Sequence, residues 1–136
     1  MNRRIALAAM IGTSLLAGPA SGGEAEVFDF SKELRGAGAG RPAVSLSLVK
    51  TPAYTVNAVA VRDHIPMHRH EDGSHVLYIV SGRGTVTLDG KPAALKAGTV
   101  VHIPTGVNHS IKVDGGTMTF VDFVQHSFDP NQAEKK

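Results

Sequence analysis

Short apolar segments separated by turn-forming residues run through most of this chain, and they limit the folds open to it. Several segments alternate apolar and polar positions, and most are rich in the β-branched residues that favour strands. Glycine, proline and aspartate stand between them, and Asp89-Gly90 is a strong signal for a two-residue hairpin. No convincing helix is indicated. The expected strands cover 44–49, 54–62, 74–81, 85–88, 91–96, 99–103, 109–113 and 117–125.

Strands of this length at regular spacing predict an all-β fold built from antiparallel sheets, either a sandwich or a jelly-roll barrel. Residues 74–81 are apolar at odd and even positions, which predicts a central strand buried on both faces. Residues 63–72 are too polar for the core, and residues 27–30 alternate as an edge strand would. The aromatic side chains expected in the core are Tyr54, Tyr78, Phe120 and Phe123.

The first twenty residues have the three parts of a secretory signal peptide. Two arginines precede an apolar run over 5–16, and small residues follow it. The run is too short to cross a bilayer core of roughly 30 Å as a helix. We therefore expect a leader over 1–20 that is cleaved after Ala20, Gly22 or Gly23 by general secretion, and a periplasmic or secreted protein. A buried N-terminal helix is the alternative.

Three further parts follow the leader. Residues 21–43 are glycine-rich and form an arm, residues 44–128 form the barrel, and residues 129–136 form a charged, flexible tail. Cleavage removes two of the 14 basic residues and leaves 12 against 12 acidic ones. With no basic run to neutralise phosphates, neither a nucleic acid nor a membrane is an expected partner of the mature chain.

Four of the seven histidines are arranged as metal ligands would be. Alternate side chains of an extended strand share a face about 7 Å apart, so His68 and His70 can reach one ion. His75 follows across a loop or bulge, and His109 follows a Pro-Gly turn. The chain has no cysteine, and neutral imidazole suits divalent first-row metals. The pattern predicts one such ion, with Fe, Mn, Zn, Cu and Ni left open.

Two motifs within residues 68–109 resemble those of the cupin family. The first is His68-x-His70-x4-His75-x6-Gly82, and the second is Gly98-x5-Pro104-x-Gly106-x2-His109. With the strand pattern on either side, the similarity extends over about residues 44–125. The resemblance implies a small single-domain jelly-roll barrel, metal ligation by His68, His70 and His109, and a homodimer formed through a sheet face or the arm.

One position departs from the family pattern. The usual glutamate of the first motif is His75 here, as in the all-histidine subset that the chain resembles. Four neutral imidazoles leave a divalent ion at a charge of about +2, whereas a glutamate would bring the centre to about +1. A more cationic centre should attract anionic oxygen ligands more strongly.

Candidates for proton transfer are less well defined. His64 is four residues before His68 and could approach the rim, as a reserve ligand or proton carrier. Glu71 could accept a hydrogen bond from a ligand's free N–H, or it could simply belong to a solvated turn. His102 and His126 are expected to be structural.

Three classes of function fit the sequence. The favoured one is a small metal-dependent enzyme of dioxygenase type that acts on a small oxygenated or acidic molecule. A redox-neutral isomerase, lyase or hydrolase is the second. The third is a protein that binds a metal or small ligand without turnover, and a barrel that kept its histidines without useful metal affinity is the alternative to all three.

Overall fold

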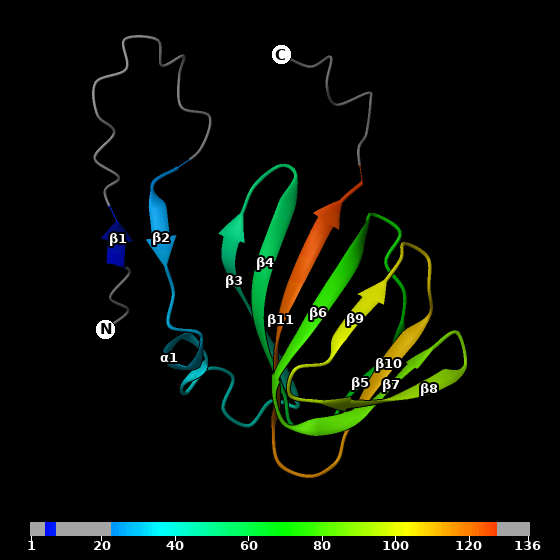
Figure 1. Cartoon of the computed structure of the whole chain (residues 1–136). Coiled ribbons are helices and arrows are strands. Elements are labelled where there is room, and N and C mark those ends of the chain that lie inside the picture. The colour runs from blue at the N-terminus through cyan, green and yellow to red at the C-terminus, as the bar shows by residue number, and fades with distance from the viewer. Residues whose placement is uncertain (1–4, 8–22, 128–136) are drawn as a thin grey trace.

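The computed structural model describes residues 5–7 and 23–127, and the regular secondary structure of this part of the chain consists almost entirely of β-strands (Figure 1). No helix within it is long and apolar enough to cross a membrane. The expected tail and all of the expected leader except Ile5–Leu7 lie outside the described residues. The elements are β1 (Ile5–Leu7), β2 (Ala25–Val27), α1 (Phe30–Leu34), β3 (Ala43–Lys50), β4 (Tyr54–Val61), β5 (His64–His68), β6 (Gly73–Ser81), β7 (Arg83–Leu88), β8 (Lys91–Lys96), β9 (Val100–Ile103), β10 (His109–Val113) and β11 (Met118–His126).

Two antiparallel sheets face each other (Figure 1). The larger has the strand order β3-β4-β11-β6-β9, and the smaller has the order β5-β10-β7-β8. Strands that are distant in sequence are neighbours in both sheets, as in a jelly roll. The predicted all-β, antiparallel jelly-roll class is confirmed, although the two sheets stay separate and are not joined by hydrogen bonds into one closed barrel.

The hydrophobic core lies between the sheets and follows the strand alternation. In β6 His75, Leu77 and Ile79 point inward and are buried, and the partner strands contribute alternate positions in the same way. Aliphatic side chains dominate this core, with one phenylalanine. The cluster consists of Val59, Val61, Leu77, Ile79, Val86, Leu95, Val101, Ile103, Ile111, Val113, Met118 and Phe120.

The expectation that β6 is buried on both faces was wrong. Its even-numbered side chains point outward, where Tyr78 is 50% exposed. Of the four aromatic residues expected in the core, only Phe120 is there. Tyr54 and Phe123 are exposed on the outer face and stack on each other, with ring centroids 5.4 Å apart. Apolar character at every position of a strand did not distinguish a buried second face from an exposed one.

The arm differs from its expected form in one respect. The chain is a strand only over β2, and the five-residue helix α1 begins within the segment that was expected to be an edge strand. Asp29 is the reason, because its side chain accepts a hydrogen bond from the Lys32 backbone N–H at 3.1 Å and caps the helix. Arg62 then holds the glycine-rich turn against the end of β4 by donating to the carbonyl oxygens of Gly38 and Arg41.

Candidate metal centre

A β-bulge in β5 turns His68 toward the interior. Ile111 of β10 pairs with Ile65, and His109 pairs with His68, so Pro66 and Met67 together oppose the single residue between them on β10. Without the extra residue, strict alternation would place His68 on the outer face with His64. Residues 63–72 were expected to be too polar for the core, and the bulge explains how part of this segment is a strand that delivers one histidine inward.

The other three histidines come from separate elements. His70 lies in the connection between β5 and β6, and its carbonyl oxygen accepts a hydrogen bond from the Gly106 N–H at 2.8 Å. This bond joins the two sequence motifs, and Gly106 can make the turn because its φ of 81° suits glycine. His75 is an inward residue of β6, and His109 is the inward first residue of β10. Both are buried.

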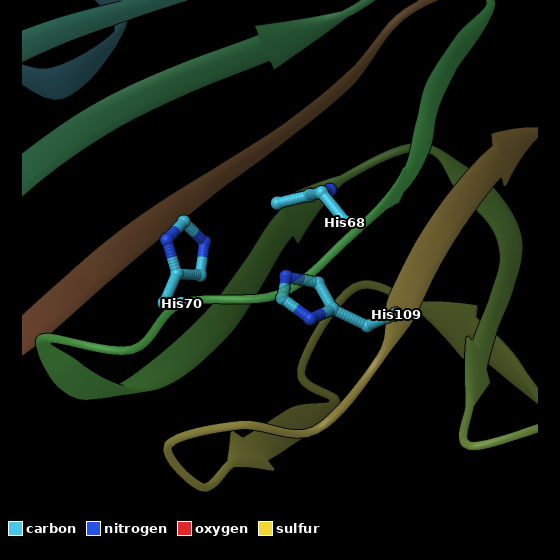
Figure 2. Close-up of side chains that lie close together, drawn as sticks. All are labelled: His68, His70 and His109. Carbon is cyan, nitrogen blue, oxygen red and sulfur yellow. The ribbon is translucent and has the colours of Figure 1, made fainter.

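The structure brings together three of the four expected ligands. One nitrogen from each of His68, His70 and His109 lies within 4.8 Å of the others. Figure 2 shows the three rings turned toward one another, and the ring centroid of His68 is 4.1 Å from that of His109. His75 is adjacent to these three residues but is not one of them, and its ring stacks on His70 with centroids 4.0 Å apart.

Hydrogen bonds set the tautomers of two of these rings. His68 Nδ1 lies 2.7 Å from the Pro66 carbonyl oxygen, and His109 Nδ1 lies 2.9 Å from the Val107 carbonyl oxygen. A carbonyl oxygen only accepts, so each Nδ1 carries the proton. Each Nε2 is then left with a free lone pair, which is the form of imidazole that binds a metal.

Asp122 is the site residue that the sequence analysis missed. It lies on β11, and its two carboxylate oxygens are 2.9 and 3.1 Å from His75 Nδ1. The signal was available, because Asp122 interrupts the alternate inward positions of β11 that carry Met118 and Phe120. A single acid at an inward position of an apolar strand needs a partner, and His75 is that partner.

These side chains surround a cavity of about 60 Å³ between the sheets. Burial lowers the pKa of His70 below its ordinary value of 6.5, and the neighbouring imidazoles lower it further. Burial also lowers the pKa of His109, although the Val107 carbonyl opposes this. Both effects favour the neutral form that a metal requires. The cavity is lined by Ile65, His68, His70, His75, Leu77, Ile103, His109, Ile111, Phe120 and Asp122.

The donor set therefore fits a divalent first-row metal ion. Several imidazoles converge, two have free Nε2 lone pairs, and an apolar wall surrounds them. Imidazole nitrogen is a poor choice for Mg²⁺ or Ca²⁺, which prefer oxygen. Metal binding by the three-histidine group of His68, His70 and His109 is thus consistent with the sequence motifs.

The two candidates for proton transfer lie away from the cavity wall. His64 faces a larger hollow of about 610 Å³ on the outer side of the smaller sheet, and its Nδ1 is 2.8 Å from Asp63. Glu71 pairs with Arg69 and is largely exposed. Neither residue lines the three-histidine cavity. His102 is exposed, and His126 bonds to the Thr55 hydroxyl at 2.9 Å.

Comparison with known families and structures agrees with this architecture. The family model described as "Cupin domain" matches residues 57–124, which are 68 of the 136 residues. A double-stranded β-helix protein from Klebsiella pneumoniae superposes with a TM-score of 0.66 at 20% identity, covering 74% of this chain and 89% of that one. A cupin-2 protein from Shewanella frigidimarina gives 0.63 at 18% identity, covering 74% and 95%. These likenesses show the fold.

Of three further comparisons, the first and the last are with proteins whose names refer to oxalate. An oxalate-binding protein from Thermotoga maritima is 36% identical over 53 residues, which cover 39% of this chain and 44% of that protein. An uncharacterized protein from Methanocaldococcus jannaschii is 35% identical over 46 residues, covering 34% and 37%. The chain thus matches less than half the length of these curated relatives. A predicted oxalate decarboxylase from Thermotoga maritima has a TM-score of 0.58 at 22% identity, covering 62% and 81%.

Replacing one imidazole should abolish stable metal binding. We expect the purified chain to hold about one divalent ion, and His70→Ala to lose it, because two remaining ligands of the group bind far more weakly than three. Elemental analysis after dialysis measures this. His102→Ala, which changes an exposed histidine, is the matched control and should keep the metal. Equal metal content in the wild type and His70→Ala would refute the site.

The metal-free protein should become less stable as the pH falls below about 6.5. The pKa values of His70 and His109 are lowered in the fold, so the unfolded chain binds more protons in the range between the folded and ordinary values. The contribution of these histidines to stability is therefore complete above the ordinary histidine pKa. It declines as the pH falls toward the lowered pKa values of the folded protein. Urea unfolding with a chelator present should show this decline, and His70→Gln should make it shallower. An unchanged slope in His70→Gln would contradict the assignment.

Proposed function

The chain belongs to the cupin family, and from that membership and its three-histidine group we propose that it binds one divalent first-row metal ion and, on it, a small oxygenated acid. The observation that carries the proposal is the convergence of His68, His70 and His109 on an apolar cavity. An ion held by imidazoles keeps positions for oxygen ligands, and a carboxylate is a natural occupant.

The size of the cavity supports a short ligand. A volume of about 60 Å³ leaves room for an ion and a ligand of two or three carbons, given that a cavity needs about 10–15 Å³ to hold a single water. The oxalate-binding relative supports the same class, because oxalate is a two-carbon dicarboxylate. We therefore propose that the ligand is a short carboxylic acid able to chelate the ion through two oxygens.

The bound ion would supply Lewis-acid polarisation of that acid and, if it is iron or another redox-active metal, oxygen-dependent chemistry. The protein's own residues have other tasks. The imidazoles would bind the ion and fix its position, and the proton of His68 and of His109 is held at Nδ1. Leu77, Ile103 and Phe120 line the cavity and exclude water, which strengthens the electrostatic interactions inside it.

We favour an oxidoreductase of dioxygenase type, as the sequence analysis did. A redox-neutral enzyme is the alternative, and the similarity to an oxalate-binding protein favours a ligand-binding role without turnover as a further one. Proton transfer by His64 or Glu71 remains a prediction. Because neither lines the cavity, each would need a route that the described residues do not provide directly.

Oxalate binding in the presence and absence of metal tests the proposal. The metal-free protein is loaded with Fe²⁺, Mn²⁺, Zn²⁺, Cu²⁺ or Ni²⁺ and titrated calorimetrically with oxalate, and with the six-carbon adipate as a matched control. We expect metal-dependent binding of oxalate and at least about tenfold weaker binding of adipate, a loss of ~1.4 kcal/mol. If no short acid binds to any loaded form, the proposal fails. Oxygen uptake during turnover separates the oxidoreductase from the alternatives.

The outer face of the larger sheet supports a homodimer. Its outward positions on β6, β9 and β11 are mostly apolar, and Val100 is 62% exposed. None of the outward residues of these three strands is Lys, Arg, Asp or Glu, as expected for a surface that a partner covers. An apolar sheet face can pack on a two-fold related copy of itself. The outward residues include Val76, Tyr78, Val80, Val100, His102, Thr119, Val121 and Phe123.

We expect light scattering to give a dimer mass at micromolar concentration and Val100→Asp with Val121→Asp to give a monomer. Charges buried against an apolar face would remain without partners, which disfavours association. Ala94→Arg on the smaller sheet is the control and should stay dimeric. A monomeric wild type would disprove this arrangement.

Export is proposed from the leader sequence. Its apolar run and small residues at the expected cleavage sites support a periplasmic or secreted protein. Mass spectrometry of the chain purified from its own cell should find a new N-terminus after Ala20, Gly22 or Gly23. An intact N-terminus on the chain isolated from the cytoplasm would contradict export.

A further inference from the structure

Asp122 is a largely buried carboxylate that the proposed function leaves without a task. We propose that Asp122 is a positioning residue that acts through His75: it strengthens metal binding by the centre and weakens the binding of anionic ligands to the loaded centre. The inference rests on the proposed function, because it concerns the same cavity. Asp122 would thereby set how strongly the site discriminates between a dianion and a less charged acid.

The geometry ties Asp122 to one imidazole. Both of its oxygens face His75 Nδ1, at 2.9 and 3.1 Å. The side chains are 14% and 10% exposed, so water screens the pair weakly. As the carboxylate accepts the hydrogen bond, the proton of His75 stays at Nδ1 and its Nε2 keeps a free lone pair. His75 stacks on His70, so the imidazole of His75 lies beside the three-histidine group as a fourth ring.

Asp122 is also the charged residue of the cavity wall. Among the residues that line the cavity, it is the single acid, and there is no lysine or arginine. Its carboxylate lines the same cavity as the three grouped histidines. A divalent ion in this cavity therefore lies in the field of one nearby negative charge.

Two consequences of opposite direction follow. A carboxylate behind an imidazole fixes the ring and makes it more basic, which strengthens attraction for a cation. The same charge repels an anion that binds to the ion, and the low dielectric of a buried cavity preserves that repulsion. Removal of the charge should therefore weaken binding of the metal and strengthen binding of a dianion. A purely structural role would not move the two affinities in opposite directions.

Asp122→Asn tests this with little change of shape. We expect the zinc Kd, measured by competition with a chelating dye, to rise roughly 10–100-fold. At saturating zinc, calorimetry should show oxalate binding several-fold more tightly than in the wild type. Asp114→Asn removes a charge at an exposed position and should change neither value. An unchanged zinc Kd in Asp122→Asn, or oxalate binding that weakens with it, would overturn the inference.

The outcomes separate this inference from the proposed function. If the wild type binds no metal, the proposed function itself fails. If the wild type binds zinc and Asp122→Asn binds it equally, only the role of Asp122 fails. Should Asp122→Asn not fold, Asp122→Glu and Asp122→Gln form a second pair of equal size that differs in charge. Zinc should bind more tightly to the Glu variant and oxalate more tightly to the Gln variant, and equal affinities within the pair would refute the charge effect.

Discussion

The pairing of β5 with β10 is the interaction on which the candidate metal centre depends. Two β5 residues oppose one residue of β10, and this single-residue bulge changes the side of the sheet on which His68 emerges. His109 is held opposite it in the same ladder. The period of a strand is two, so a shift of one residue exchanges the inner and outer faces completely. A proline within the bulge suits a position where the ladder is interrupted.

Around this ladder, ordinary sheet packing supplies the rest of the centre. The inner faces of both sheets bury an aliphatic core, and the cavity occupies one region of it. Backbone carbonyl oxygens orient two imidazoles, and the Gly106 N–H bonds to the His70 carbonyl, so the connection between β5 and β6 is tied to the turn before β10. Ligand orientation is thus built into the backbone, and it needs few additional side chains.

Asp122 changes the electrostatic interpretation of position 75. Histidine at position 75 replaces the glutamate of the family pattern and brings no negative charge. Four neutral imidazoles alone would therefore leave the centre with the full charge of its ion. The structure adds a carboxylate behind His75, so the negative charge is present but lies one imidazole farther away. A carboxylate at that distance can modulate the ion while leaving the ion's own positions to imidazole and to an oxygen ligand.

The sequence by itself determined the fold class, most strand positions and a set of four histidines that includes the three that group together. Local alternation, turn residues and motif spacing carry this information because they depend on neighbours along the chain. Only the tertiary structure decided which faces are buried, as Tyr78 and Phe123 show, and which partner Asp122 finds. It also decided that His64 faces away from the cavity while His68 faces into it. These outcomes depend on strand register and on contacts between residues far apart in sequence, and no local pattern encodes them.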